Sequence, residues 1–293
     1  MSELTHISYI RQLLQRHNFT FDKRLGQNFL INPGVCPRMA EMGGAAPGVG
    51  VLEIGPGIGV LTRELCSRAE RVVAVEIDAR LIPVLRETMS GFHNLHLVEG
   101  DVLAVDLADL IAREFAGCSE VVVCANLPYY ITSPVITHLL ESRLPISAIT
   151  VMVQKEAAQR LAAEPGTRAC GAISAAIWYY SKPQILFSVS AGSFMPAPKV
   201  DSAVVRMDVR REPSVSVESE KAFFKTVKAA FAQRRKTVLN SVSSSLGLPK
   251  QQIEQVIRSA DIAPGERAER LTLLDMARLS NALCNAGLID DDA

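Results

Sequence analysis

The feature that most constrains the fold is a regular alternation of short apolar runs with longer helical stretches, which starts near residue 49. Five runs are rich in Val, Ile, Leu and Ala, and they cover 49–55, 71–78, 95–101, 121–127 and 148–154. Their ends lie roughly 22 to 27 residues apart, which is typical of strand–helix–strand units. Because the runs are nearly continuous rather than alternating, we expect strands buried on both faces. The pattern therefore predicts a doubly wound α/β domain with a parallel sheet and right-handed crossovers.

Two further strands are expected after a helix over 173–180. Their sequences lie at 184–190 and 202–209 and predict an antiparallel pair at one edge of the sheet. The segment between them holds Pro196 and Pro198. Since proline has no backbone N–H, we expect no hydrogen-bonded strand in that segment.

A change to a wholly helical pattern follows the polar, proline-containing segment 211–219. The predicted helices cover 220–233, 235–246, 250–259 and 269–286. We therefore place a domain boundary near residue 211. The expected organisation is an α/β domain over 1–211, which includes a basic N-terminal segment over 1–32, and a smaller all-helical domain over 212–293.

Composition excludes several classes of protein. Hydrophobic residues make up 48% of the 293 residues, so the chain can bury a core. No uncharged apolar stretch reaches the roughly 18 residues of a membrane span, and charges scattered through the first residues argue against a signal peptide. The six cysteines form no Cys-x-x-Cys pair and have no His at metal-ligand spacing, which favours a cytoplasmic protein with reduced thiols and no metal. The net charge is zero, and nothing requires more than a monomer.

Glycines follow the first apolar run, at the place where open α/β sheets bind their ligands. Gly55, Gly57 and Gly59 alternate with other residues and permit a tight turn with close approach to a ligand. The third glycine comes one residue earlier than in the dinucleotide fingerprint. This spacing favours a ligand without a pyrophosphate.

Acidic residues follow the next two runs. Glu76 is placed to accept hydrogen bonds from ribose hydroxyls, as in sites for NAD or for S-adenosylmethionine. Asp101 is suited to accept a hydrogen bond from an adenine amino group. Taken singly, each feature is more often a loop glycine or a solvated acid. Three of them at successive strand ends favour a binding site.

The fourth run ends in Asn126-Leu127-Pro128-Tyr129, which suits methyl transfer to the exocyclic amine of a base. Such an amine is a poor nucleophile because its lone pair is delocalised into the ring. The Asn126 side-chain oxygen and the Leu127 carbonyl, aimed by Pro128, can hold both N–H bonds so that the lone pair faces a methylsulfonium. The Tyr129 ring offers a face for an extruded base. In an arbitrary sequence these residues are an ordinary strand-to-helix turn, but here they follow three ligand-like strand ends.

Over almost its whole length the chain resembles the KsgA family of ribosomal RNA adenine dimethyltransferases. The resemblance rests on Leu25-Gly26-Gln27-Asn28-Phe29-Leu30, Glu53-Ile54-Gly55-Pro56-Gly57, Glu76, Asp101, Asn126-Leu127-Pro128-Tyr129, Phe194-Met195-Pro196-Ala197-Pro198-Lys199-Val200-Asp201-Ser202 and Arg234-Arg235-Lys236-Thr237. It implies the Rossmann-like fold of class I S-adenosylmethionine-dependent methyltransferases. Members of the family convert two adjacent adenosines near the 3′ end of small-subunit (16S) rRNA to N6,N6-dimethyladenosine. The implied partner is therefore the immature small ribosomal subunit.

The resemblance also implies a role for individual residues. The cofactor, S-adenosyl-L-methionine, is expected to contact Asn28, Leu30, Gly55, Glu76, Asp101 and Asn126. Asn126, Leu127 and Tyr129 would hold the target amine, and Phe194 would sandwich the base from the other side. A core phenylalanine is the alternative for Phe194, although its proline-flanked loop favours a stiff scaffold for a ligand.

Local charge favours an RNA partner. Between residues 221 and 253 the chain has seven basic residues and no acidic one, whereas solvated faces normally mix both signs. The expected RNA contacts are Lys221, Lys225, Lys228, Arg234, Arg235 and Lys236. On a helix the three lysines share one face, while Phe224, Val227 and Phe231 face elsewhere, toward a core.

The N-terminal segment is a second candidate for RNA contact. It holds Asn28 together with the basic residues Arg11, Arg16, Lys23 and Arg24. We expect this segment to close over the cofactor with its basic side toward RNA phosphates. An ordinary solvated helix is the alternative.

Four other functions fit parts of the pattern. The closest is a relative that methylates a large-subunit rRNA adenine, but Leu127 in place of isoleucine, the Ser133-Pro134 pair and the 234–236 run favour the small-subunit enzymes. A small-molecule methyltransferase needs no basic helices, and a nicotinamide oxidoreductase conflicts with the glycine spacing. An RNA-binding assembly factor without catalytic activity would keep the basic residues and even the pocket, so it stays open.

Overall fold

The computed structural model describes residues 3–21 and 27–289. The chain divides into two compact units. The α/β unit comprises Met1–Ala158 and Pro183–Val209, and the helical unit comprises Gln159–Lys182 and Arg210–Ala293. The division at Arg210 lies next to the boundary expected near residue 211. The helical unit differs from that expectation because it also includes residues 159–182.

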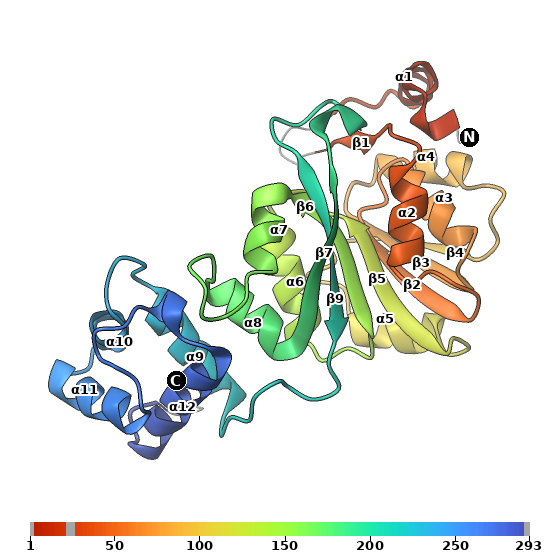
Figure 1. The fold of residues 1–293 in the computed structure, drawn as a ribbon. Helices are drawn as coiled ribbons and strands as arrows, with labels where there is room; N and C mark the ends of the chain where they lie inside the picture. Colours follow the sequence, from red (N-terminus) through yellow and green to blue (C-terminus); the bar gives the residue numbers. More distant parts are fainter. Residues whose placement is uncertain (1–2, 22–26, 290–293) are drawn as a thin grey trace. The chain divides into compact units, whose positions relative to one another are not determined.

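A seven-stranded sheet is the centre of the α/β unit (Figure 1). Its strands are β2 (Val49–Ile54), β3 (Arg71–Glu76), β4 (Leu95–Glu99), β5 (Glu120–Asn126), β6 (Ala148–Gln154), β7 (Ser181–Val189) and β9 (Ser202–Val209). Across the sheet they follow the order β4-β3-β2-β5-β6-β9-β7. The first five strands of this order are parallel, and β9 runs antiparallel to β6. The order reverses between β2 and β5, which is where ligands bind in open α/β sheets.

The predicted strands are confirmed, each to within a few residues. All six residues of β2 are buried, and the interior of β5 is buried as well. This double-sided burial explains why their sequences are continuous apolar runs. The two late strands form the edge of the same sheet, and β7 tolerates Pro183 because an edge strand has one side without a ladder partner.

Helices flank the sheet in Figure 1. They are α2 (Val35–Met42), α3 (Val60–Cys66), α4 (Leu81–Thr88), α5 (Leu107–Glu114), α6 (Thr132–Glu141) and α7 (Lys155–Leu161). Helix α1 (Ile7–Arg16) lies near the N-terminus, at the top of the view. The core against β2 and β3 includes Met39 from α2, Leu65 from α3 and Leu85 from α4, all fully buried. The Asp106 side chain caps α5 by accepting from the Asp109 backbone N–H.

A two-stranded ribbon joins the N-terminal segment to the loop after β7. Strand β1 (Phe29–Leu30) pairs antiparallel with β8 (Phe194–Met195), so that Leu30 lies opposite Phe194. The expectation that no strand forms between 190 and 202 is therefore wrong. The pairing stops before Pro196, whose missing N–H ends the ladder, so the proline limits the strand rather than preventing it.

The helical unit contains α8 (Ala172–Tyr180), α9 (Glu220–Phe231), α10 (Val238–Leu246), α11 (Lys250–Ser259) and α12 (Leu273–Asn285). Side chains cap three of these helices: Ser219 caps α9, Thr237 caps α10, and Thr272 forms a capping box with Asp275 at α12. Two predicted helix starts are therefore too early, because α10 begins at Val238 rather than at 235 and α12 begins at Leu273 rather than at 269.

An aromatic cluster explains why α8 belongs to the helical unit. The Tyr179 ring stacks on Phe223 of α9 at 4.9 Å between centroids, and the Tyr180 ring stacks on Phe224 at 5.4 Å. Both tyrosine hydroxyls donate to the Glu220 carboxylate. The pattern predicted Phe224, Val227 and Phe231 as the core-facing side of α9. Val227 is buried as predicted, but Phe223 is the fully buried aromatic, and Phe224 and Phe231 are half-buried.

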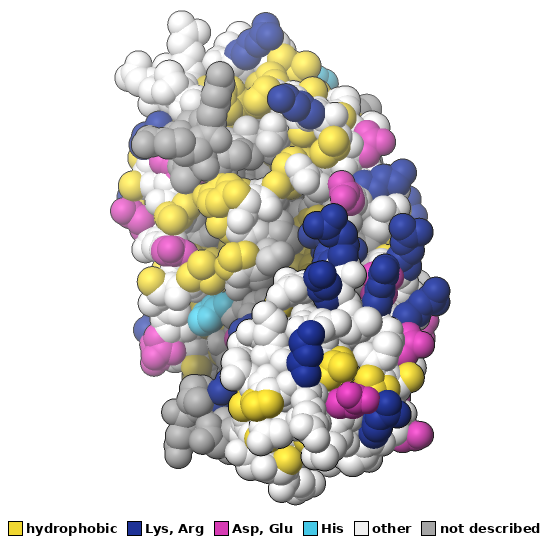
Figure 2. All heavy atoms as spheres, turned by 90° about the vertical axis from the view of Figure 1, so that its left-hand side faces the viewer, with side chains coloured by type: hydrophobic (Ala, Val, Ile, Leu, Met, Phe, Trp, Pro, Cys, Tyr) yellow, Lys and Arg dark blue, Asp and Glu magenta, His cyan; other side chains and the backbone are white. Residues whose placement is uncertain are grey.

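Lys and Arg side chains are exposed on the face drawn in Figure 2. They are dark blue, and magenta acidic side chains lie among them. On α9, Lys221 and Lys228 are exposed and Lys225 is half-buried. Arg234, Arg235 and Lys236 are exposed in the turn before α10 rather than on a helix. Among the described residues, no helix is long and apolar enough to cross a membrane.

Candidate functional site

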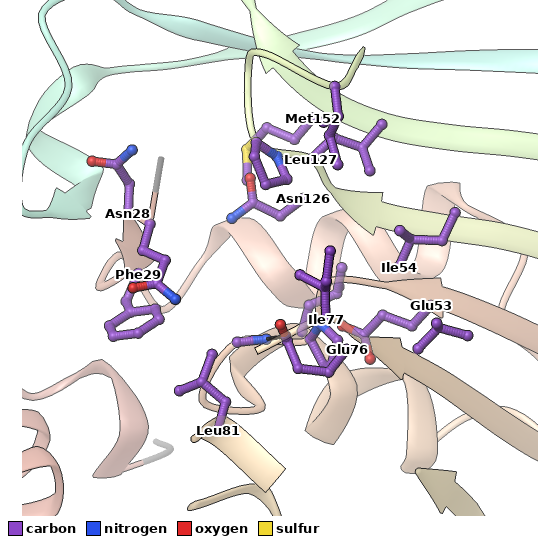
Figure 3. Close-up of a pocket in the computed structure, with 18 of the residues that line it drawn as sticks. Asn28, Phe29, Glu53, Ile54, Glu76, Ile77, Leu81, Asn126, Leu127 and Met152 are labelled. Atoms are coloured by element: carbon purple, nitrogen blue, oxygen red, sulfur yellow. Dashed lines mark hydrogen bonds between the residues drawn. The ribbon is translucent and has the colours of Figure 1, made fainter. Parts of the chain in front are cut away.

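A pocket in the α/β unit lies at the carboxyl ends of the central strands. Its lining includes all nine residues that the sequence predicted for cofactor and target base, which are Asn28, Leu30, Gly55, Glu76, Asp101, Asn126, Leu127, Tyr129 and Phe194. In Figure 3, Glu53 and Glu76 lie on one side of the pocket, Asn28 and Phe29 on another, and Asn126 with Leu127 along a third. Residues far apart in the sequence are therefore brought to one place.

The glycine turn after β2 needs a backbone that other residues rarely adopt. Gly55, Gly57 and Gly59 have φ of 68°, 62° and 92°. A Cβ on Gly55 would meet no atom within 4 Å, so the space above it is open toward the pocket, whereas a Cβ on Gly57 would lie 3.3 Å from the Phe29 ring. The turn therefore leaves room for a ligand against bare backbone.

Glu76 at the end of β3 is held by backbone donors. Its Oε2 accepts from the Gly57 N–H at 3.2 Å, and its Oε1 accepts from the Asp78 N–H at 2.9 Å. Burial raises the pKa of Glu76 to about 6, even though these hydrogen bonds favour the charged form. A carboxylate has about four acceptor positions, so Glu76 keeps capacity for two more donors.

Asp101, the second predicted acid, is more exposed. It follows β4, and its Oδ1 accepts from the Leu103 N–H at 3.0 Å. The neighbouring Gly100 donates its N–H to the Glu76 carbonyl at 2.9 Å, which fixes this loop beside the end of β3. Asp101 and Glu76 are thereby held at adjoining strand ends of the same pocket.

The N-terminal segment reaches the pocket through a charged anchor. Gln27 donates from Nε2 to Asp78 Oδ2 at 2.8 Å, and Arg80 binds the same carboxylate through Nε and Nη2. The Arg80 guanidinium lies over the Phe19 ring, 5.0 Å from its centroid. Asn28 is thus placed between Gln27 and the paired strand β1. The predicted residues Lys23 and Arg24, together with Leu25 and Gly26 of the motif, lie outside the described residues.

Arg16, a basic residue of this segment that was expected to contact RNA, forms an ion pair within the protein. Arg16 forms an ion pair with Glu87 of α4, with 2.5 Å between Nη2 and Oε1, and His17 contacts the other oxygen of Glu87. Arg11 is exposed. Of the two predicted RNA contacts of the segment that the structure describes, Arg16 therefore serves to fasten α1 to α4.

The turn after β5 carries the residues expected to hold the target. Leu127 is 2% exposed, and its N–H donates to the Met152 carbonyl at 3.3 Å. The Tyr129 hydroxyl lies 3.0 Å from Ser202 Oγ at the start of β9, which orients the half-buried ring. Asn126 is half-buried at the end of β5 and faces the pocket in Figure 3.

Phe194 differs from the loop residue that the sequence predicted. It lies in strand β8 and is 4% exposed, and its side chain belongs to the hydrophobic core while also lining the pocket. The pairing with Leu30 places it there, because that pairing turns the loop after β7 into a short ribbon. A base could therefore contact Phe194 only through the part of its ring that lines the pocket.

Sequence reasoning gave no separate role to Glu53, which lines the same pocket. It is 1% exposed, and its Oε2 has no hydrogen-bond partner among the residues that the structure describes. Burial raises its pKa to about 8, and nearby Glu76 adds to this rise. The signal that could have found it is a lone charge in the otherwise apolar run 49–55. Among the described residues, no group of three or more His, Cys, Asp or Glu could hold a metal.

Comparisons with known proteins identify a family that matches most of the chain. The family of ribosomal RNA adenine dimethylases matches residues 18–285. The ribosomal RNA small subunit methyltransferase A of Geobacillus sp. (strain WCH70) is 47% identical over 93% of this chain and 95% of its own. Its counterpart from Alkaliphilus oremlandii (strain OhILAs) is 43% identical over 97% of this chain and 99% of its own.

Two solved structures share the fold over most of the chain. A dimethyladenosine transferase from Plasmodium falciparum superposes with a TM-score of 0.73 and 25% identity, over 88% of this chain and 98% of that one. The 23S rRNA methyltransferase ErmE superposes with a TM-score of 0.66 and 29% identity, over 88% of this chain and all of the other. The sheet order, the pocket at its switch point and these matches lead to one conclusion: the chain belongs to the ribosomal RNA adenine dimethylase family of S-adenosylmethionine-dependent methyltransferases.

Proposed function

We propose that the protein transfers methyl groups from S-adenosylmethionine to N6 of two adjacent adenosines near the 3′ end of small-subunit rRNA, during maturation of the small ribosomal subunit in the cytoplasm. The observation that carries the proposal is one pocket in which Glu76 and Asp101 lie with the Asn126–Tyr129 turn. Relatives that are 42–47% identical and named for the small subunit favour that subunit over the large one.

The pocket fits the cofactor. Bare backbone at Gly55 leaves space for a ligand, Glu76 retains acceptor positions for ribose hydroxyls, and Asp101 can accept from an adenine amino group. Asn28 and Leu30 would contact the cofactor from the ribbon side, and Asn126 from the end of β5. When bound, the cofactor supplies an electrophilic methyl group on a sulfonium.

The target adenine would lie against the turn after β5. The Asn126 side-chain oxygen and the Leu127 carbonyl accept the two N–H bonds of the amine, which turns its lone pair toward the methyl group. Tyr129, oriented through Ser202, offers a face for the extruded base, and Phe194 bounds the other side. The methylated nitrogen is cationic and releases a proton readily to solvent, so this mechanism needs no strong base. Positioning then supplies most of the catalysis.

The helical unit would supply affinity for RNA. Lys221, Lys225 and Lys228 lie on one side of α9, and Arg234, Arg235 and Lys236 follow in the exposed turn. Contacts of this kind neutralise phosphates and carry little sequence information, so they would set the strength of binding rather than the choice of base.

Methyl incorporation from labelled S-adenosylmethionine tests the proposal. Immature small subunits and, in parallel, large subunits are purified from cells that lack their own dimethylases. Label in small-subunit RNA alone supports the proposal. Label in large-subunit RNA would assign the activity of the ErmE-like relatives instead, and cofactor binding with no label in either subunit would favour an assembly factor.

A further inference from the structure

Glu53 is a buried carboxyl group with an unsatisfied oxygen at the wall of the pocket. It lies in β2 beside the glycine turn and is 1% exposed, and no described residue forms a hydrogen bond with its Oε2. Glu76, its neighbour in Figure 3, has a backbone N–H on each of its two oxygens. The Glu76 carboxylate is therefore stabilised by backbone hydrogen bonds on both oxygens, whereas Glu53 Oε2 receives no such bond from the described residues.

Within residues 3–21 and 27–289, no group that acts on Glu53 carries a positive charge. The groups that act on it or are acted on by it are Cys36 of α2, Thr62 and Cys66 of α3, Glu76 of β3 and Cys124 of β5. The buried Thr62 hydroxyl lies beside Glu53 and favours its charged form, but burial outweighs this effect. None of the ion pairs among the described residues includes Glu53. Burial of an unpaired carboxylate costs several kcal/mol, so the neutral acid is favoured.

A cationic ligand in the pocket would reverse this preference. A positive charge within about 4–6 Å favours the ionised carboxylate, and the effect is strong where water is excluded. Under the proposed function, on which this inference rests, the ligand carries two positive groups, a sulfonium and an ammonium. Glu53 is a buried carboxyl on the pocket wall, and among the described residues no cation pairs with it and no donor satisfies its Oε2.

We propose that Glu53 is a proton-linked counter-charge for the cofactor: its carboxyl is protonated in the free protein and ionises when a positively charged ligand enters the pocket. The O–H bond of the carboxyl breaks, its proton passes to solvent, and the carboxylate remains to face the ligand's positive charge. At most one proton is released for each cofactor bound.

Two other acids of the pocket would behave differently. Burial raises the pKa of Glu76 only to about 6, so it is already ionised at pH 7.5, whereas burial raises that of Glu53 to about 8. Burial raises the pKa of the Cys36 thiol well above its usual value, so this thiol stays protonated. At pH 7.5 the released proton therefore comes from Glu53.

The linkage makes cofactor affinity depend on pH. Below a pH of about 8, Glu53 must lose its proton before it can pair with the ligand, and this deprotonation weakens the observed binding. The Kd of the wild-type protein therefore rises by up to about tenfold for each unit by which the pH is lowered. Glu53→Gln is neutral at every pH. Its Kd should stay flat, about tenfold weaker than wild type at pH 8, and the two curves should converge near pH 6.

Isothermal titration calorimetry in phosphate and in Tris buffer at pH 7.5 tests the proposal without any turnover. The difference in heat between the buffers gives the protons released. We expect more than half a proton for wild type, because a carboxyl with a pKa of about 8 is about three-quarters protonated at pH 7.5. We expect none for Glu53→Gln, and a wild-type value for the control Glu99→Gln, an exposed acid at the end of β4. S-adenosylhomocysteine, which lacks the sulfonium charge, identifies the partner: equal release points to the ammonium, and lost release points to the sulfonium.

Infrared difference spectra of the wild-type protein provide a readout that does not depend on a variant. We expect a protonated-carboxyl band in the free protein that disappears when the cofactor binds. Wild-type binding without proton release and without loss of this band would overturn the proposal, as would unchanged release in a folded Glu53→Gln protein. If the wild-type protein binds no S-adenosylmethionine at all, the proposed function itself fails.

Discussion

Gln27 donates from its Nε2 to Asp78 Oδ2 across 2.8 Å, and this bond joins the segment before β1 to the loop after β3. Asp78 also pairs with Arg80, whose hydrogen bonds lower the pKa of this carboxyl below its usual value. Two sides of the pocket are thereby fixed relative to each other, because Asn28 follows Gln27 and Glu76 precedes Asp78. This carboxylate and the β1–β8 pairing together hold the N-terminal wall of the pocket.

The change Asp78→Asn should therefore weaken cofactor binding rather than chemistry. The variant keeps the shape of the side chain but loses the charge that holds Gln27 and Arg80, and hydrogen bonds to charged groups contribute about 1.5–3 kcal/mol. We expect the KM for S-adenosylmethionine to rise about tenfold while kcat changes less than twofold. Asp109→Asn, which removes a surface partner of Arg113, is the matched control. An unchanged KM with loss of kcat would contradict the positioning role.

Asn126→Ala should remove most of the turnover and leave RNA binding nearly intact. The side-chain oxygen is proposed to orient the target amine, and loss of one such preorganised contact costs about 100-fold in kcat. Single-turnover methyl transfer and a separate RNA-binding titration measure the two effects. Full methyl transfer by a folded Asn126→Ala protein would exclude this residue from the mechanism.

The double change Lys228→Glu with Arg235→Glu should weaken RNA binding and flatten its dependence on salt. Each lost phosphate contact lowers the slope of log K against log salt by about 0.7 to 0.9. Arg258→Glu, on α11 of the same unit and 64% exposed, controls for a general change in charge. A salt slope equal to that of wild type would place the RNA surface elsewhere.

The stability of the free protein should fall as pH rises from about 4.5 to about 8. Glu53 binds its proton more tightly in the folded protein than in the unfolded chain, so its contribution is complete below pH 4.5 and is lost as pH rises through its folded pKa of about 8. Urea unfolding of wild type and Glu53→Gln across this range measures the effect. We expect a shallower decline for the variant, and parallel curves would mean that Glu53 is ionised in the free protein.

The sheet was predictable from the sequence because burial on both faces leaves a direct mark, namely continuous apolar runs such as 121–127. The gathering of Gly55, Glu76 and Asn126 followed from the rule that parallel strands end at one edge. Helix starts were less predictable. Arg234 and Arg235 are good helix formers, yet Thr237 caps α10, and the Val238 N–H donates to the Glu266 carbonyl.

Contacts between segments that are far apart in the sequence could not be predicted from local sequence patterns. Nothing near Tyr179 indicates that its ring stacks on Phe223, so the sequence could not show that α8 packs with the helical unit. The ribbon between β1 and β8 is equally non-local, and it turns Phe194 from an expected loop residue into a buried one. Glu53 was visible as a charge in an apolar run, but its missing partner is a property of the folded environment alone.

The central claim is that the pocket dimethylates adenine of small-subunit rRNA. Mass spectrometry of nucleosides from immature small subunits, incubated with the protein and S-adenosylmethionine, tests it most directly. We predict N6,N6-dimethyladenosine in small-subunit RNA with the wild-type protein, none in large subunits treated in parallel, and nearly none with Asn126→Ala. Dimethyladenosine only in large-subunit RNA, or no methylated adenosine in either, would contradict the account.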